Sequence, residues 1–459
     1  MSRYLLTGLG LLALMCLPSC MQQGDSPSGD ETQVLDTKEE ILARIVAPVF
    51  PERDFLLSDF GASADGLGDN KAAFAAAMTA SREAGGGRIV VPAGEYLVNG
   101  PIHFVSNTEL HLEEGARIFF SSDPQHYLPV VPTSWEGTLL HNYSPFVYAY
   151  QCENIAITGK GRIDGESSET WQLWRDKQKD SQLLSRRMNN DAVPLEERIF
   201  GEGHYLRPHL IQFYDCRNIL VEDVLIEDSP FWCLHLLMCE NVTVRGLRFD
   251  AHNKNNDGID PEYSRDVLIE KVVFNNGDDN VAIKAGRDHE GRSMARPTEN
   301  IIVRDCQLQG LHGIVIGSEM ASGVRNVFVE DCVAGGYLKR GLYIKSNPDR
   351  GGEISNIYFN NVQLDVVEDA FFITSFYHQE GEGHVTHIHD VFVENVYCRE
   401  ATAAGIVVHG FPELKVHDVH FTNVTIEKAD IAFDLQDARN IVLEDVSIGG
   451  QAGPPTWAQ

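Results

Sequence analysis

Basic residues are scarce in this sequence. Its 459 residues include 37 Lys and Arg against 67 Asp and Glu, which gives a formal net charge of −30 at pH 7. A nucleic-acid partner is therefore not expected, because contacts to phosphates need a basic surface. With 43% hydrophobic and 23% charged residues, the composition is that of a folded globular protein and excludes a chain that is disordered throughout.

Closely spaced cysteine pairs are lacking as well. Of nine Cys, Cys16 and Cys20 lie near the N-terminus, which leaves seven, and none of them forms a CxxC pair. A zinc site is therefore not expected, and an odd number of thiols cannot all be paired in disulfides. We predict that most of these Cys are small apolar residues of the core.

An apolar run long enough to span a bilayer comfortably is also missing. The stretch from Leu5 to Leu17 follows the positively charged Arg3 and is typical of a secretory signal. It ends in Leu17-Pro18-Ser19-Cys20, which resembles a bacterial lipobox, and this resemblance implies that Cys20 is lipidated after cleavage. The alternative is ordinary signal cleavage with Cys20 merely nearby.

These features predict the organisation of the chain. We expect a signal peptide at residues 1–20, a flexible polar tether at 21–45 and one folded domain at 46–459. The protein is then exported and anchored by lipid to the bacterial cell envelope, touches the membrane only through that anchor, and is expected to be a monomer.

A short phrase recurs along the rest of the chain: an Asn or Asp followed by alternating apolar and polar residues. Its starts are separated by 64 residues in the first interval and then by 23, 25, 34, 26, 30, 34, 28 and 22. A minimum near 22 with variable additions is typical of one solenoid coil plus loops. The phrases begin at Asn154, Asn218, Asn241, Asp266, Asn300, Asn326, Asn356, Asp390, Asp418 and Asn440.

Alternation with a period of two residues predicts strands, and helical spacing is missing from these phrases. One phrase cannot bury its apolar side alone, so coils must stack with parallel strands about 4.8 Å apart. The sequence therefore predicts an all-β fold, a single-stranded right-handed parallel β-helix. The Cys agree with this, because Cys152, Cys216 and Cys239 each precede the Asn of a phrase by two residues and would stack inside.

A helix is expected near residues 71–84, which are rich in Ala and precede Gly85-Gly86-Gly87. This helix is predicted to cap the N-terminal end of the solenoid, where strand edges would otherwise be exposed. Residues 166–206 are polar and interrupt the repeat, so we predict a large loop there that walls a cleft.

Acidic residues are concentrated in one window of the solenoid. Asp257 and Asp278 are 21 residues apart, about one coil, and Asp279 follows directly. When carboxylates lie this close together, their mutual repulsion raises the pKa of at least one of them. This supplies a protonated acid beside ionised bases. Glycoside hydrolysis needs such a combination. The alternatives are a calcium site or Asp residues that form turns beside Gly.

The motifs around these carboxylates resemble those of family 28 glycoside hydrolases, the polygalacturonase family. The family's Asn-x-Asp-Gly, Gly-Asp-Asp, Gly-His-Gly and Arg-Ile-Lys motifs have counterparts in the same order. The resemblance covers roughly residues 54–450 and implies a β-helix hydrolase that acts with inversion and needs no metal or other cofactor. The counterparts are Asn255-Asn256-Asp257-Gly258, Gly277-Asp278-Asp279, Leu311-His312-Gly313 and Tyr343-Ile344-Lys345.

The resemblance also implies roles for single residues. Asp278 would be the general acid that protonates the leaving oxygen, and Asp257 and Asp279 would activate the attacking water. His312 would support the acid, although a lone His is otherwise more often structural. Lys345 would meet a carboxylate of the substrate.

Two positions depart from the family motifs. Tyr343 replaces the Arg, which removes a bidentate partner for a carboxylate, and Leu311 replaces the first Gly. We still expect Tyr343 and Asn255 to contact the substrate. Phe231-Trp232 is either an aromatic platform for a sugar or internal packing.

An acidic protein that acts on a polyanion needs a locally basic cleft. Arg287 and Arg350, with Arg292 and Arg340, lie on nearby Gly-rich or polar segments and are candidates for substrate binding. The alternative is that they are solvated charges. Tyr377, on the coil after Lys345, is a further candidate.

The sequence therefore predicts an inverting hydrolase of α-linked galacturonic acid residues, with a pectic polysaccharide or oligosaccharide as its partner. The segments 166–206 and 287–298 favour exo action, because they would block one end of a cleft. One alternative is a hydrolase of rhamnogalacturonan or another decorated pectin, which the Tyr343 departure favours. The others are a polyuronide lyase, with calcium bound by the Asp residues, and a catalytically silent glycan-binding lipoprotein.

Overall fold

The computed structural model describes residues 35–379, 381–452 and 456–457. The predicted signal peptide, Cys20 and the tether up to residue 34 lie outside the described residues. Within the described part of the chain, no helix is long and apolar enough to cross a membrane.

The Asn or Asp at the start of each repeated phrase forms the turn between two strands. All ten of these residues have positive φ, between 49° and 60°. Their short polar side chains tolerate this left-handed conformation because they hydrogen-bond locally. The amides also stack from coil to coil: Asn218 donates to Asn154 over 2.9 Å, and Asn241 donates to Asn218 over 2.8 Å. The phrase seen in the sequence is therefore a turn followed by a strand, repeated once per coil.

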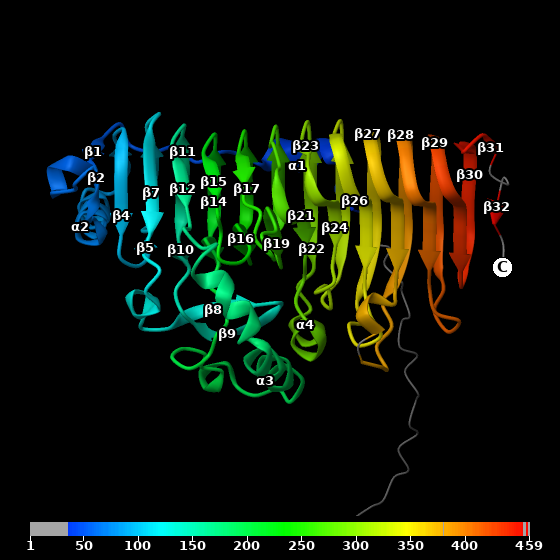
Figure 1. The fold of residues 1–459 in the computed structure, drawn as a ribbon, viewed down its shortest axis with the longest axis horizontal. Coiled ribbons are helices and arrows are strands. Elements are labelled where there is room, and N and C mark those ends of the chain that lie inside the picture. Colours follow the sequence, from blue (N-terminus) through cyan, green and yellow to red (C-terminus); the bar gives the residue numbers. More distant parts are fainter. Residues whose placement is uncertain (1–34, 380, 453–455, 458–459) are drawn as a thin grey trace, which may run out of the picture. The chain divides into compact units, whose positions relative to one another are not determined.

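The strands pair in parallel with the corresponding strands of the next coil, and Figure 1 shows them following one another along the stack in chain order. One ladder consists of β1 (Asp54–Leu56), β3 (Gly87–Val91), β6 (Thr108–Leu112), β11 (Glu153–Gly159), β14 (Arg217–Glu222), β17 (Glu240–Arg245), β20 (Arg265–Glu270), β22 (Thr298–Arg304) and β25 (Val324–Glu330). A second consists of β5 (Ile102–His103), β10 (Val147–Tyr150), β13 (Ile211–Tyr214), β16 (Leu234–Leu237), β19 (Ile259–Glu262), β21 (Asn276–Ile283) and β24 (Gly310–Ile316). A third consists of β2 (Asp65–Asp69), β4 (Gly94–Val98), β7 (Ala116–Phe120), β12 (Arg162–Asp164), β15 (Leu225–Glu227) and β18 (Arg248–Asp250).

The later coils are built from longer strands that continue the first two ladders, and isolated bridges through Val273 link the third ladder to β23, which confirms the predicted parallel β-helix. The parallel strands are β23 (Gln307–Leu308), β26 (Val333–Lys345), β27 (Glu353–Thr374), β28 (His387–His409), β29 (Val416–Gln436) and β30 (Ala438–Ile448). The antiparallel additions are the hairpin β8 (Val131–Trp135) and β9 (Thr138–Asn142), and β31 (Gln451–Ala452) and β32 (Thr456–Trp457) against β30.

Inward-facing aliphatic residues form a continuous column through the solenoid. Side chains in register on consecutive coils are fully buried, and each stabilises the fold by about 1.5–3 kcal/mol. The column is Ile155, Ile219, Val242, Val267, Ile301, Val327, Ile357, Val391, Val419 and Ile441. The seven described Cys are also buried and unpaired, and the backbone N–H of Cys152 lies 3.3 Å from Sγ of Cys216 on the next coil, so the predicted core role is confirmed.

The expected N-terminal helix is present as α2 (Lys71–Glu83). It packs Phe74 and Met78 into the hydrophobic core beside the first coil. The glycines that follow have φ values of 80°, 116° and 151°, which end the helix because only Gly adopts them without strain.

The predicted tether is too long at its C-terminal end. Residues 38–44 form the helix α1 (Lys38–Arg44), which packs Ile41 against Leu268 and Ile302 on the outside of the solenoid. Arg44 also pairs with Asp266 at 2.8 Å. This part of the chain therefore belongs to the folded domain.

The segment 166–206 is not an irregular loop, because it contains η3 (Trp171–Asp176), α3 (Lys179–Asn190) and η4 (Leu195–Glu197). The fully buried residues of α3 are Ser181, Ser185 and Asn189, and its apolar contacts to the hydrophobic cluster around Trp135 come from Leu184 and Met188, a stripe of one helical turn. A further short helix, α4 (Asp288–Met294), occupies the segment 287–298. Figure 1 shows α3, α4 and the β8–β9 hairpin on the same side of the stacked strands.

Candidate active site

A cavity of about 710 Å³ opens beside the ends of the β19, β21 and β26 strands. It is lined by residues from several parts of the chain: the β8–β9 turn, the η3–α3 segment, the loops before β16 and β19, strand β21 and the residues after it, the end of β26, and the loops after β24, β26 and β27. The lining residues are Glu136, Arg175, Gln178, Lys179, Gln182, Arg186, Trp232, Asn255, Asp257, Asp278, Asp279, Lys284, Arg287, Ser318, Glu319, Lys345, Arg350, Tyr377 and His378.

The three predicted carboxylates all line this cavity. The register Ile259–Val281 between β19 and β21 brings the loop that carries Asp257 next to the strand that carries Asp278 and Asp279. The backbone N–H of Gly258 donates to the carbonyl of Asp279 over 2.9 Å, and this hydrogen bond holds the loop of Asp257 against strand β21.

Asp279 is buried and fully engaged by cations and donors. Its Oδ2 lies 2.9 Å from Nζ of Lys345, and its Oδ1 lies 2.7 Å from Nδ1 of His312. Burial by itself would raise the pKa of Asp279, but the charge of Lys345 and the hydrogen bond with His312 outweigh it and hold that pKa well below its usual range. Asp279 is therefore ionised at neutral pH.

Asp278 has the opposite environment on the adjacent residue. Burial and then the negative charge of Asp279 raise its pKa, while Lys345 and His312 oppose the rise. Its nearest ion-pair partner is His312, at 3.9 Å. A carboxyl that holds its proton more tightly than usual thus stands beside a carboxylate that holds it less tightly, which is the division of roles that general acid–base catalysis needs.

Asp257 belongs to a second charged group, formed with Asp260 around Lys284. Nζ of Lys284 lies 3.7 Å from Asp257, 3.6 Å from Asp260 and 3.5 Å from Glu319. Burial raises the pKa of both Asp257 and Asp260, and Lys284 opposes that rise. Since one ammonium does not balance all of these carboxylates, protonation of one member of the Asp257–Asp260 pair is favoured.

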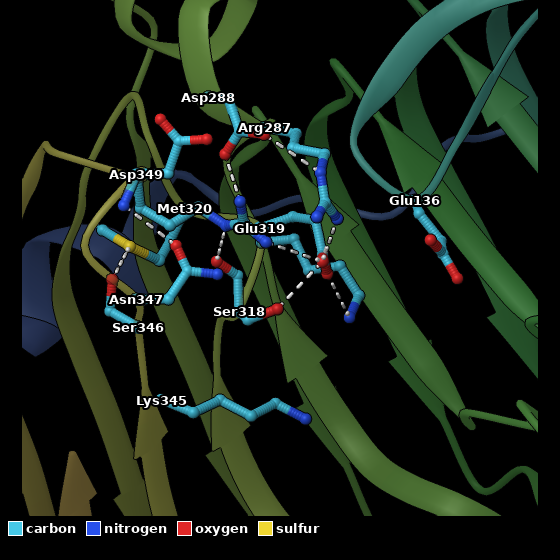
Figure 2. A network of polar contacts seen from close by, with 12 residues as sticks. Glu136, Arg287, Asp288, Ser318, Glu319, Met320, Lys345, Ser346, Asn347 and Asp349 are labelled. Atoms are coloured by element: carbon cyan, nitrogen blue, oxygen red, sulfur yellow. Dashed lines mark hydrogen bonds and ion pairs between the residues drawn. The ribbon is translucent and has the colours of Figure 1, made fainter. Parts of the chain in front are cut away.

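Two of the four candidate Arg reach the cavity, and both are held by Glu319. Arg287 lies 3.1 Å from Glu319 and Arg350 lies 3.5 Å from it, and both also pair with Asp288. Figure 2 shows Arg287 reaching Asp288 on one side and Glu319 on the other. The other two candidates do not line the cavity.

These two, Arg292 and Arg340, have other partners. Arg292 donates to the carbonyl of Arg350 over 3.1 Å and so supports the loop that carries it. Arg340 pairs with Asp369 at 3.3 Å, and its guanidinium lies 4.6 Å from the centre of the Tyr343 ring.

Tyr343 and His312 do not line the cavity, but they contact residues that do. The ring of Tyr343 is buried, 5.1 Å from Nζ of Lys345 and 5.4 Å from the ring of His312. The position where the family motif has Arg therefore supports the catalytic neighbourhood without lining the cavity. Tyr377 does line it, with its ring 5.1 Å from Nζ of Lys345.

Asn255 and Trp232 also reach the cavity. Asn255 accepts a hydrogen bond of 2.7 Å from the buried Arg207, whose pKa burial lowers to about 10. Trp232 lies with its ring 4.5 Å from Nζ of Lys284, whereas Phe231 is fully buried and stacks on Trp135. Phe231 is therefore internal packing, and the role of Trp232 as a platform for a sugar stays a prediction.

Three further charged residues of this region, Lys284, Glu319 and Arg207, were not predicted to have a role. Lys284 had a signal, because it directly follows β21 and the core positions Val281 and Ile283 place it on the opposite, outer face. The other two had none, since a single charged residue in a loop does not show which partner it meets.

A metal would fit poorly among the carboxylates. Asp278, Asp279 and His312 offer ligand atoms within 4.8 Å of one another. Both oxygens of Asp279 are already taken, however, one by His312 and the other by the ammonium of Lys345. A calcium ion would have to displace that ammonium, which disfavours the lyase alternative.

Comparison with known proteins agrees with this geometry. The profile of glycosyl hydrolases family 28 matches residues 200–453, and that of the rhamnogalacturonase A/epimerase, pectate lyase-like group matches residues 57–111. A hyperthermoactive exopolygalacturonase from Thermotoga maritima is 40% identical, with a TM-score of 0.87, over 91% of this chain and 96% of that one. A probable polygalacturonase of Vitis vinifera is 26% identical over 81% of this chain and 74% of its own length. An endo-polygalacturonase of Pectobacterium carotovorum subsp. carotovorum is 26% identical over 78% of this chain and 85% of its own length.

A parallel β-helix whose cavity holds two adjacent carboxyls with opposite pKa shifts, together with these matches, defines the class of protein, a glycoside hydrolase. The family match covers more than half of the chain and includes every motif carboxylate. This chain belongs to glycosyl hydrolases family 28, as the resemblance of its motifs implied.

Proposed function

We propose that the protein is an exo-acting polygalacturonase that hydrolyses α-linked galacturonic acid residues of pectin with inversion. The observation that carries the proposal is the pair of adjacent carboxyls with opposite pKa shifts, Asp278 raised and Asp279 lowered, in a cavity lined by an excess of basic residues.

In this mechanism Asp278 donates its proton to the glycosidic oxygen as the bond to the anomeric carbon breaks. Asp279 and Asp257 accept the proton of the water that attacks from the opposite face. Asp257 acts as a base when the proton of its pair resides on Asp260, and Lys284 stabilises the charge that this leaves on Asp257. His312 and Lys345 keep Asp279 ionised.

The charge of the cavity supports an anionic substrate. Its lining includes seven Lys and Arg against five Asp and Glu, although the chain as a whole carries −30. Among the described residues, Arg175 and Lys179 form no ion pair, so they are available to the carboxylates of a polyuronide. Arg287 and Arg350 are engaged by Glu319 and are the less available pair.

Exo action is supported by the wall of the cavity. The η3–α3 segment contributes five lining residues, and Glu136 of the β8–β9 turn is bonded to Gln182 of α3 over 2.9 Å. A wall across one end lets only a chain end enter. The exopolygalacturonase from Thermotoga maritima, at 40% identity, points the same way.

The decisive experiment is incubation with de-esterified polygalacturonate, in which new reducing ends, ultraviolet absorbance and product sizes are recorded together. We expect reducing ends without absorbance, and monomer or dimer as the early product. A ladder of oligomers would refute exo action, and rising absorbance would identify a lyase. If neither signal appeared, rhamnogalacturonan or another decorated pectin would become the first candidate substrate.

We further propose that the protein is exported, lipid-anchored through Cys20, and monomeric. The support is the lipobox-like sequence Leu17-Pro18-Ser19-Cys20, which lies outside the described residues. Metabolic labelling with a fatty acid should mark the wild type and not a Cys20→Ala variant, and labelling of both would refute the anchor. Sedimentation of the soluble domain without the signal peptide and Cys20, at several concentrations, should show a single mass somewhat below the 51.1 kDa of the full chain.

A further inference from the structure

A group of His and Glu side chains lies on three consecutive coils near the C-terminal end of the solenoid. We define the histidine cluster as Glu353, His387, His389 and His417. Glu353 at the start of β27 is in register with His387 at the start of β28, and His389 is in register with His417 of β29. None of the four lines the active-site cavity.

Ligand atoms converge within this cluster. Glu353, His387 and His389 each offer one atom, and these atoms lie within 4.8 Å of one another. Nε2 of His389 is 3.1 Å from Oε1 of Glu353, and Nε2 of His417 is 2.8 Å from Nε2 of His387. Imidazole nitrogens with one carboxylate oxygen are the donor set that Zn²⁺ and related divalent ions prefer.

Carboxylates behind two of the rings decide which nitrogen faces the cluster. Nδ1 of His389 lies 2.8 Å from Oδ2 of Asp390, and Nδ1 of His417 lies 2.6 Å from Oδ2 of Asp418. An Nδ1–H that donates to its carboxylate leaves the Nε2 lone pair directed at the cluster. Metal-ligating His residues are commonly oriented in this way.

The charges of the cluster call for a cation. With Nδ1–H donated to Asp390, Nε2 of His389 faces the carboxylate of Glu353 lone pair to lone pair, which is repulsive unless a proton or a metal ion lies between them. Arg439, in register with His417 on β30, is the positive group that opposes a cation.

We propose that the histidine cluster binds one divalent transition-metal ion of the Zn²⁺ type through Glu353, His387 and His389, and that His417, which approaches only His387, moves in as the fourth ligand. Two nitrogens on one tetrahedral Zn²⁺ lie about 3.3 Å apart, so His387 and His417 must separate slightly on binding. The ion ties together the consecutive strands β27, β28 and β29 and stabilises this end of the solenoid. It takes no part in the hydrolysis.

Isothermal titration of untagged, chelator-treated protein with Zn²⁺ alone tests the proposal, with metal analysis of the dialysed complex. We expect one Zn²⁺ per chain and a higher Tm when it is bound. The variants His389→Gln and Glu353→Gln should bind Zn²⁺ at least tenfold more weakly, and Asp418→Asn about 10- to 100-fold more weakly.

The matched control is His420→Gln, which removes a histidine of β29 that stacks on Phe392 outside the cluster and should leave Zn²⁺ binding unchanged. Circular dichroism without metal establishes that each variant is folded, and the exposed Glu353 provides a variant with little risk to the fold. Failure of the wild type to bind Zn²⁺ would overturn the proposal and leave a proton as the cation of the cluster. Zn²⁺ that persists in His389→Gln but disappears in Asp278→Asn would also overturn it, by moving the ion to the active-site cavity.

Discussion

Replacement of Asp278 with Asn tests the proposed role of this residue as the general acid. The Oδ1 atom of Asp278 accepts a 3.1 Å hydrogen bond from the backbone N–H of Asp279, which an Asn oxygen can also accept. The side chain is 23% exposed, so the substitution creates no cavity and no buried unpaired group. The change therefore removes the proton donor and little else.

The expected loss follows from the role of the proton. A positioned general acid contributes about 10²–10⁴-fold to the rate, which corresponds to about 3–5.5 kcal/mol of activation free energy. The wild type should lose turnover as the pH rises through the raised pKa of Asp278, and this limb of the pH profile should be absent from the variant. An aryl galacturonide, whose leaving group needs no protonation, should lose much less than the polymer does.

The assay measures reducing ends released from polygalacturonate between pH 4 and 8, with Tm measured in parallel. The matched control is Asp365→Asn, which removes an exposed carboxylate that pairs with Arg399 on a later coil and should leave turnover unchanged. If Asp278→Asn keeps turnover within a few-fold of the wild type, or loses the polymer and the aryl substrate equally, the assignment of the acid is refuted.

Three further predictions follow from single contacts. In Lys345→Met, the pKa of Asp279 should rise because its ammonium partner at 2.9 Å is gone, so the acidic limb of the kcat profile should move to higher pH; an unmoved limb would contradict the role of Lys345. Lys179→Met should raise KM for polygalacturonate about tenfold with kcat nearly unchanged, and the effect should weaken with added salt; an equal fall in kcat would argue against a binding role. Ile301→Ala should cost about 2–5 kcal/mol of unfolding free energy in denaturant titrations, against about 0.5 kcal/mol or less for the half-exposed Ile431→Ala, and equal losses would refute the column as the main source of stability.

Local chemistry made most of the fold predictable. Three patterns each describe a single coil: the Asn or Asp at its turn, the alternation that follows, and the Cys at equivalent positions. Such coils can bury their apolar sides only by stacking. The helix at 71–83 was predictable for the same reason, since its Ala-rich sequence and the following Gly triplet act within a few residues. Helix α3 was missed because its fully buried residues are Ser and Asn and its apolar stripe is only Leu184 and Met188, which is too short to stand out in a polar segment.

For the site, the sequence by itself determined which residues carry the chemistry: the spacing of Asp257, Asp278 and Asp279 and the order of the motifs point to a carboxylate-based hydrolase. Only the tertiary structure decided their protonation, because the pKa of Asp279 depends on Lys345, 66 residues away, and that of Asp257 on the charges around Lys284. It alone also paired Arg287 and Arg350 with Glu319 and brought together the histidine cluster from three coils. The physical reason is range: a turn or an apolar alternation acts over neighbouring residues, whereas a charge acts through space on whatever the stacking of the coils brings within a few ångströms.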